Sequence, residues 1–259
     1  MRAHTTVTTQ CPPPLVAVAH GSRDPRSATT VRALVELVRA GMPHVLVRTA
    51  FLDLSDPPLP DLLIELHAEG HRHVVVVPLL LGDAYHARVD LPGIVARLTD
   101  RLPHLQVTVS DVLGPDPVLG ELALRRVRET GADVTDPRLG VLVAAVGSSH
   151  APANAAVGRL AESWEERHGF MATPVFASST QPDVPAALAA LRARGARRFA
   201  VASWFLAPGI LPDRVRDAVR ASVPDARIAA PLGAEPTIAE VIRRRYSTAL
   251  ATPRDHRPT

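Results

Sequence analysis

The chain has 259 residues, of which 46% are apolar and 3% aromatic, and it carries a net charge of +3. Its basic residues are all Arg, which alternate with Asp and Glu along apparent helices, so we do not expect a nucleic-acid partner. One cysteine, Cys11, excludes an internal disulfide, a CxxC redox motif and a cysteine-ligated iron–sulfur cluster. No apolar run reaches the roughly 18 residues of a membrane span and the start lacks the apolar region of a signal peptide, so we expect a cytoplasmic protein with no membrane partner.

Apolar runs and amphipathic stretches alternate along the chain from Leu15 onward. The runs typical of buried strands cover 15–20, 45–53, 73–82 and 105–114. Stretches with helical periodicity follow them at 24–41, 57–70, 91–102 and 116–131. This alternation predicts an α/β fold built on a parallel sheet.

The same order of elements returns after the polar stretch 131–138. Strands are predicted at 139–150, 173–179, 197–209 and 226–233, and helices at 156–169, 182–195, 212–222 and 235–246. Phe51 matches Phe176, Gly70 matches Gly195, and "LGPDP" at 113–117 matches "LGAEP" at 232–236. We therefore predict two tandem similar domains, each a parallel four-stranded sheet flanked by helices. The predicted division is a disordered arm at 1–14, a domain carrying the active site at 15–130, a degenerate repeat at 139–250 and a flexible tail at 251–259.

Two histidines and one carboxylate follow directly on predicted strands. His20 ends the run "LVAVAH", Asp53 follows "VRTAFL", and His86 lies in "LLLGDAYHARVD". Because ligands of open parallel sheets bind outside the carboxyl ends of the strands, these side chains are candidates for one site. Imidazole and carboxylate suit Fe²⁺ or Co²⁺, and a neutral imidazole also accepts protons near neutral pH. The alternative is that the histidines only cap loops at the edge of the sheet.

Other sites are weaker candidates. His67, His71 and His73 resemble a metal cluster, but Gly70 is expected to end the helix between them, so His67 and His71 would not share a face. The chain has no GxGxxG after its first strand, no phosphate-binding GxxxxGK[ST], no GxSxG and no HExxH. Dinucleotide-binding, P-loop, hydrolase and zincin interpretations therefore lack their motifs.

Three motifs resemble a known family. They are "AHGSRDP" at 19–25, "AFLDLSDPPLPDLL" at 50–63 and "VVVVPLLLGDAYHARVDLP" at 74–92. The chain resembles the CbiX/SirB-type sirohydrochlorin chelatases, class II chelatases that insert Co²⁺ or Fe²⁺ into the tetrapyrrole sirohydrochlorin. The resemblance runs through both halves and implies the two-domain form, with the active site in the interdomain cleft.

The resemblance implies roles for particular residues. His20 and His86 would be catalytic and would bind the metal, and Asp53 would be catalytic where the family usually has Glu, one methylene longer. Ser22, Arg23, Gly82, Tyr85 and Arg88 are candidates to bind the substrate, because Arg side chains and loop amides suit its carboxylates. In the second half, Val146, Ser178 and Leu211 replace His20, Asp53 and His86. Only the first half therefore keeps the three residues expected to act in catalysis. In the second half, His150 could reach toward the cleft or cap a loop.

The expected reaction is insertion of a divalent metal with release of two protons, and the expected partners are sirohydrochlorin and that metal. No permanently bound cofactor is expected, since Fe²⁺, which we slightly favour, or Co²⁺ would be a substrate. The alternative is a carrier protein that binds metal or tetrapyrrole without turnover. Because shorter members of the family pair as homodimers, we expect a monomer that forms this pair internally.

Overall fold

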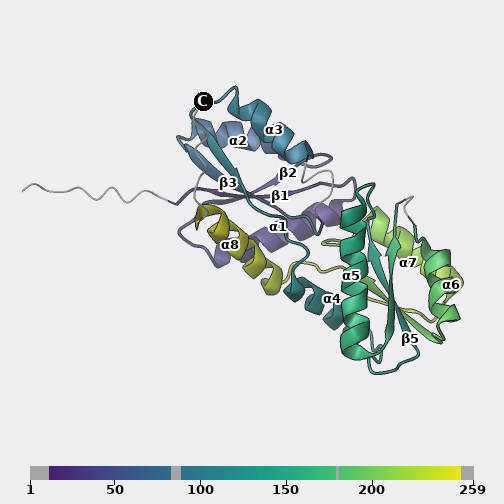
Figure 1. The fold of residues 1–259 in the computed structure, drawn as a ribbon. Coiled ribbons are helices and arrows are strands. Elements are labelled where there is room, and N and C mark those ends of the chain that lie inside the picture. Colours follow the sequence, from purple (N-terminus) through teal and green to yellow (C-terminus); the bar gives the residue numbers. More distant parts are fainter. Residues whose placement is uncertain (1–11, 83–88, 179–180, 252–259) are drawn as a thin grey trace, which may run out of the picture.

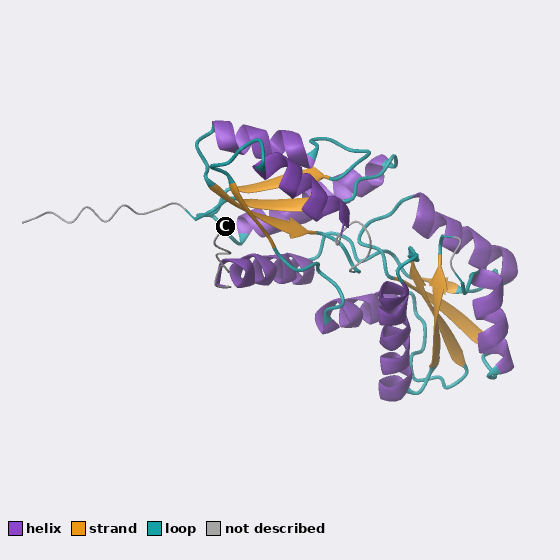
Figure 2. Cartoon of the chain, turned by 45° about the horizontal axis from the view of Figure 1, so that its top comes forward, coloured by secondary structure: helices purple, strands orange, loops and turns teal. Residues whose placement is uncertain are grey.

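The computed structural model describes residues 12–82, 89–178 and 181–251, and in these it has eight strands and eight helices that alternate (Figures 1 and 2). The strands are β1 (Leu15–Ala19), β2 (Val47–Phe51), β3 (His73–Pro78), β4 (Gln106–Val109), β5 (Leu139–Ala145), β6 (Met171–Phe176), β7 (Arg198–Ser203) and β8 (Arg227–Ile228). The helices are α1 (Pro25–Ala40), α2 (Leu59–Ala68), α3 (Leu91–Thr99), α4 (Pro117–Glu129), α5 (Ala151–His168), α6 (Val184–Ala193), α7 (Ile210–Ser222) and α8 (Pro236–Ala251). The predicted order of elements is confirmed.

The strands form two parallel four-stranded sheets, ordered β2-β1-β3-β4 and β6-β5-β7-β8. In each sheet the chain steps from the first strand to one side and then returns to the other side. The connections that follow the two central strands therefore run to opposite sides of the sheet. Open α/β sheets bind ligands beyond the carboxyl ends of the two strands where the connections part in this way. In the first sheet that point lies at the carboxyl ends of β1 and β3.

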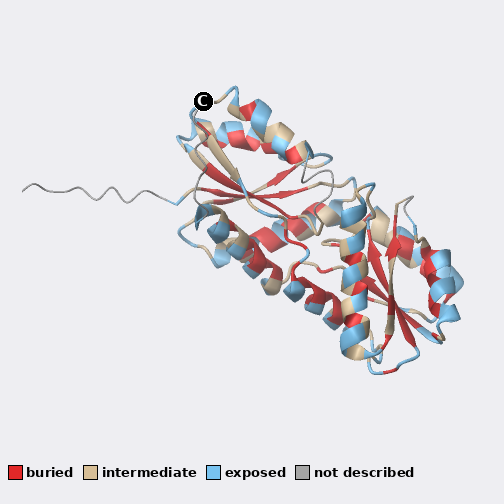
Figure 3. Ribbon diagram, in the orientation of Figure 1, coloured by how far each residue is buried: buried red, intermediate tan, exposed pale blue. Residues whose placement is uncertain are grey.

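Buried aliphatic residues explain why these segments are parallel strands. All five residues of β1 and all seven of β5 are buried, as expected for strands covered by helices on both faces (Figure 3). Helix starts are fixed by Asp-Pro pairs: the Asp24 carboxylate accepts a hydrogen bond from the Arg26 N–H at the start of α1. Pro25 then occupies the first helical position, where its missing N–H costs nothing.

The two repeats, 15–130 and 139–250, exchange their last helices. Helix α8, at the end of the second repeat, packs on α1, β3 and β4 of the first, and Figure 1 shows it beside α1. Helix α4, at the end of the first repeat, packs on β7 and against α5 of the second. One hydrophobic core consequently runs through both repeats, from Leu34 and Val75 to Val143 and Trp164.

Reciprocal ion pairs mark this exchange. Asp116, before α4, binds Arg244 of α8 with an Oδ2–Nη2 distance of 2.6 Å. Glu235, before α8, binds Arg125 of α4 with an Oε2–Nη2 distance of 2.7 Å. Asp116 and Glu235 occupy equivalent positions of "LGPDP" and "LGAEP". Each repeat therefore contacts the other as the subunits of a two-fold dimer do, with the same contact made in both directions.

Candidate functional site

His20 and Asp53 are brought together by the pairing of β1 with β2. The parallel pairing continues past the strand ends, where the Leu52 N–H donates to the Ala19 carbonyl and the Asp53 N–H donates to the His20 carbonyl, each at 2.9 Å. His20 is partly buried, and its Nδ1 lies 3.3 Å from the Gly21 carbonyl oxygen. Asp53 is exposed, and one of its carboxylate oxygens accepts the Leu54 N–H at 2.8 Å. The predicted neighbours therefore lie side by side at the carboxyl edge of the sheet.

Gly21 makes this arrangement possible. Its φ angle is +96°, a conformation that L side chains rarely adopt, and a Cβ added there would lie 1.7 Å from the Asp53 carbonyl oxygen. The loop after β1 can therefore touch the loop after β2 only because residue 21 has no side chain. Leu54, in the second of these loops, is a non-glycine residue with a φ of +59°.

Ser22 joins the same two loops. Its N–H donates to the Ser55 hydroxyl and its carbonyl accepts from that hydroxyl, both at 3.2 Å. The Ser22 hydroxyl accepts the Asp24 N–H at 3.0 Å. Ser22 therefore has a structural role in fixing the loop, and its hydroxyl can still donate to a ligand. Arg23, beside it, is exposed.

The third predicted position lies beyond β3. The Leu79 N–H donates to the Val18 carbonyl at 2.7 Å, so the chain leaves β3 next to the end of β1. Gly82 is partly buried, with nothing within 4 Å of the position a Cβ would take. His86, Tyr85 and Arg88 lie outside the described residues.

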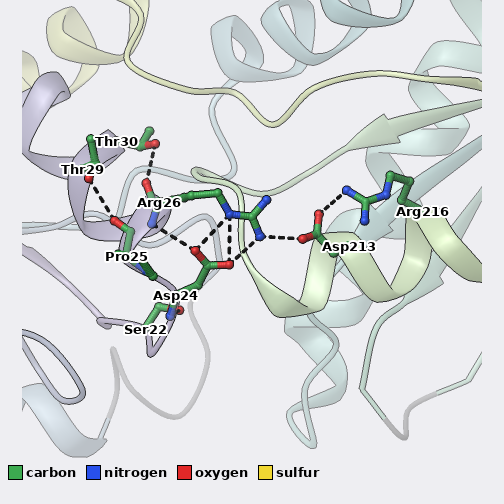
Figure 4. A network of polar contacts seen from close by, with 8 residues as sticks. All are labelled: Ser22, Asp24, Pro25, Arg26, Thr29, Thr30, Asp213 and Arg216. Carbon is green, nitrogen blue, oxygen red and sulfur yellow. Dashed lines mark hydrogen bonds and ion pairs between the residues drawn. The ribbon is translucent and has the colours of Figure 1, made fainter.

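The second repeat faces this edge through α7. Arg26, in the first turn of α1, binds Asp24 and reaches Asp213 of α7 with an Nη2–Oδ2 distance of 2.5 Å (Figure 4). Asp213 also accepts from Arg216 at 2.6 Å. The hydrogen bonds that Arg26 donates hold the pKa of Asp24 below its usual value, and the same bonds to Asp24 and Asp213 raise the pKa of Arg26. A Cβ added at Gly209 would lie 3.9 Å from the Ser22 hydroxyl oxygen. The loop after β1 is therefore flanked by the start of α7.

Four exposed apolar side chains lie in the connections that follow strands of the two sheets. Leu54 follows β2, Val89 lies between β3 and α3, Val146 follows β5 and Ile210 begins α7. Val146 occupies the position equivalent to His20, because Ser178 donates to the Val146 carbonyl as Asp53 donates to the His20 carbonyl. The second repeat thus presents apolar surface where the first presents polar groups.

Several of these features could not be found by the sequence reasoning. Arg26 and Asp213 are 187 positions apart, and no local pattern links them. The sequence indicated Ser55 only weakly, as a turn residue two positions after Asp53 in "FLDLSDPP". His150 precedes α5, and its side chain makes no hydrogen bond that caps this helix.

The histidines around Gly70 do not form a metal site. Gly70 has a φ of +97° just after the end of α2, which separates His67 from His71, and His73 Nε2 lies 2.9 Å from the Thr108 hydroxyl. Within the described ranges, no group of three or more His, Cys, Asp or Glu residues is arranged to hold a metal ion. Of the predicted set of His20, Asp53 and His86, the described residues include only His20 and Asp53. In the same part of the chain, no helix is long and apolar enough to cross a membrane.

Known proteins share this architecture and sequence. A sirohydrochlorin ferrochelatase of Priestia megaterium is 23% identical over 239 residues, 91% of this chain and 90% of the relative. A sirohydrochlorin cobaltochelatase of the same organism is 25% identical over 207 residues, 78% of this chain and 67% of the relative. The solved structure of SirB from Bacillus subtilis with Fe³⁺ superposes with a TM-score of 0.77 at 22% identity, covering 92% of this chain and 95% of SirB. It supports the fold alone.

The sequence model of one family matches almost the whole of both repeats. It covers residues 14–130 and again 140–249, each time over a complete set of four strands and four helices. The two matches coincide with the repeats found in the sequence and with the two sheets. On this evidence the chain belongs to the CbiX family.

Proposed function

We propose that this protein is a sirohydrochlorin chelatase, which inserts a divalent metal into the tetrapyrrole and releases two protons. The observation that carries the proposal is the His20–Asp53 pair at the switch point of the first sheet, in a chain of the CbiX family. Relatives that match most of this chain are named as ferrochelatase and cobaltochelatase. The substrate metal is accordingly Fe²⁺ or Co²⁺, both of which accept imidazole and carboxylate ligands.

The proposed mechanism follows from what metal insertion requires. The free-base macrocycle must lose its two inner N–H protons as the metal enters, and the metal must lose water. His20 and His86 would present the metal, and each would accept one of the two protons once the metal has left it for the macrocycle, because the one free lone pair of a neutral imidazole serves either as a ligand or as a base. Asp53, next to His20, supplies a carboxylate that offsets the charge of the metal or of a protonated histidine.

Binding of the macrocycle is assigned to the loops around this pair. Arg23 and Arg88 would bind the peripheral carboxylates, with the Ser22 hydroxyl, Tyr85 and the backbone at Gly82 as further contacts. Leu54, Val146 and Ile210 supply exposed apolar surface of the kind that a flat macrocycle covers. The cleft between the repeats is thus the proposed binding site, and the cytoplasm is the proposed location.

The second candidate is a carrier that binds metal or tetrapyrrole without turnover, which the same side chains could serve. The two functions are separated by adding excess sirohydrochlorin and Fe²⁺ or Co²⁺ to limiting protein and following the absorbance of the free base. A chelatase converts many equivalents, at a rate proportional to protein concentration and above the rate without protein. Conversion that stops at one equivalent would identify a carrier and contradict our proposal.

A further inference from the structure

A cavity of about 250 Å³ lies in the second repeat, between α7 and the edge of its sheet formed by β7 and β8. Its apolar walls include Val201, Phe205, Val215 and Ile228. Ligand pockets for drug-sized molecules measure about 300–1,000 Å³, so this cavity suits a small group rather than a whole macrocycle. It is separate from the His20–Asp53 pair, although Arg26 of the first repeat also lines it.

Charged side chains line the cavity unequally. Three of its lining residues are Arg26, Arg216 and Arg220, whereas Asp213 is the one acidic residue among those that line it. Asp213 binds both Arg26 and Arg216 (Figure 4). Arg220 makes no ion pair or hydrogen bond with any residue in the described part of the chain. Arg216 is also paired with Asp217, with an Nε–Oδ1 distance of 2.9 Å, so Arg220 is the lining arginine that is left to pair with a bound anion.

A serine with little exposed surface lines the same space. Ser203 is only 5% exposed, lines the cavity, and its hydroxyl has no hydrogen-bond partner among the residues the structure describes. This oxygen is not among the fully buried side-chain atoms that lack a partner in the described residues, so it is open to solvent in the cavity and can bind a ligand there. Pro78 occupies the equivalent position of β3, as shown by the matching pairs Val18–Pro78 and Ala144–Ser203, so this hydroxyl is particular to the second repeat.

We propose that this cavity binds a carboxylate carried on a short apolar stem. The Arg220 guanidinium pairs with the carboxylate, the Ser203 hydroxyl donates to it or to a water that it holds, and the stem packs on Val201, Val215 and Ile228. The ligand is either a free short-chain acid or a carboxyalkyl arm of a larger molecule held in the cleft. The site does not depend on the proposed chelatase activity, and only an assignment to an arm of sirohydrochlorin would rest on that proposal.

The test is a titration of the full-length chain, labelled at its Val and Ile methyl groups, with butyrate. We expect the methyl signals of Val201, Val215 and Ile228 to shift and saturate, and butylammonium, with the same stem and opposite charge, to leave them in place. Arg220→Gln should weaken butyrate binding by about tenfold or more, and Ser203→Ala by less. Arg159→Gln removes an exposed Arg on α5, outside the cavity, and should change nothing.

Metal-free sirohydrochlorin distinguishes the two sources of the carboxylate. If it shifts the same three methyl signals and competes with butyrate, the cavity receives an arm of the substrate; if the two bind independently, the ligand is a free acid. Absence of saturable shifts with butyrate, or equal binding by wild type and Arg220→Gln, would overturn the proposal. Because this titration does not measure metal insertion, its failure leaves the chelatase proposal untouched, and failure of the chelatase assay leaves the cavity untouched.

Discussion

At the scale of the residue, the candidate site depends on the contact between two loops. The His20 carbonyl and the Asp53 N–H are joined by a hydrogen bond of 2.9 Å, and Gly21 packs on the Asp53 backbone in a left-handed conformation. The position of the His20 side chain relative to Asp53 therefore depends on the backbone conformation of Gly21, the residue that follows it. A substitution that leaves both candidate side chains in the sequence can still separate them.

Gly21→Ala is expected to disrupt this contact. Gly70 provides a matched control, because its φ of +97° is close to the +96° of Gly21 but nothing lies within 4 Å of an added Cβ. Gly70→Ala should cost about 1–2 kcal/mol, the penalty for a left-handed alanine. Gly21→Ala should lower the free energy of unfolding further and reduce metal insertion, because its Cβ meets the Asp53 carbonyl. Equal losses in urea unfolding would show that the clash has no consequence.

Asp24 should make stability depend on pH. Because hydrogen bonds from Arg26 lower the pKa of Asp24 below 3.8, its carboxylate contributes to the free energy of unfolding fully above that ordinary value. The contribution is lost as the pH falls through the lower pKa of the folded state. Asp24→Asn, which keeps a good helix cap, should therefore melt below wild type at about pH 7, and the difference should be smaller at about pH 3, below the ordinary pKa of 3.8.

The control for that comparison is Asp225→Asn, at an exposed position in the connection between α7 and β8. Its melting temperature should follow wild type at both pH values. A difference between wild type and Asp24→Asn that is as large at about pH 3 as at about pH 7 would mean that the ionised Asp24–Arg26 pair does not stabilise the folded state.

At the scale of the element, the exchanged helices begin with acidic residues that differ in burial. Asp116 is 8% exposed and both caps α4 and binds Arg244, whereas the Glu235 side chain is 20% exposed and binds Arg125 and Arg126. Removing Asp116 therefore removes a helix cap and leaves an arginine without its buried partner. Removing Glu235 removes the ion-pair partner of Arg125 and Arg126, whose side chains are 49% and 23% exposed.

We expect Asp116→Ala to destabilise the protein by about 1–3 kcal/mol and Glu235→Ala by about 1 kcal/mol or less. Chemical denaturation of the two variants beside wild type measures both effects. The reverse order would show that the ion pairs at α8 matter more than the cap at α4.

The sequence predicted these helices but not the sheets they cover. The alternation of strand and helix and the match of "LGPDP" with "LGAEP" were sufficient for the order of elements and the repeat. Helices α4 and α8 each present an apolar face, and either sheet can cover that face, so the local pattern is the same with and without exchange. Only the long-range pairs, such as Asp116 with Arg244, decide between the arrangements.

The strand ends at the site were predicted more successfully than the side chains around them. His20 and Asp53 follow buried strands, and parallel strands end at one edge, so their proximity followed from the pattern. Asp213 and Arg26 come together because α7 of one repeat approaches α1 of the other, and this depends on how the two sheets are oriented. Strand β8 covers only Arg227–Ile228, where the sequence predicted 226–233.

At the scale of the whole molecule, the two repeats contact each other through the exchanged helices α4 and α8, with equivalent ion pairs in both directions. We therefore expect a monomer. A chain ending at Thr130 keeps His20, Asp53 and His86 but lacks α8, which covers β3 and β4, and the sheet on which α4 packs. It should self-associate, with α4 of one copy covering the sheet of another, because the uncovered face is apolar.

Light scattering of both chains, with a chain ending at Ala251 as the control, measures this expectation. The control keeps every described helix and strand and should match the full-length protein. A stable dimer of the full-length chain, or a monomeric and fully active chain ending at Thr130, would contradict the interpretation of the second repeat as a built-in partner.

In the proposed mechanism, His20 and His86 carry out metal insertion, with Asp53 assisting. It is tested most directly by the rate of Fe²⁺ and Co²⁺ insertion into sirohydrochlorin by His20→Ala, His86→Ala and Asp53→Ala, with the exposed His104→Ala as the control. We predict losses of about 100-fold or more for the two histidine variants, a smaller loss for Asp53→Ala, and unchanged rates for His104→Ala, with circular dichroism unchanged throughout. Near-wild-type rates in His20→Ala and His86→Ala would contradict the account.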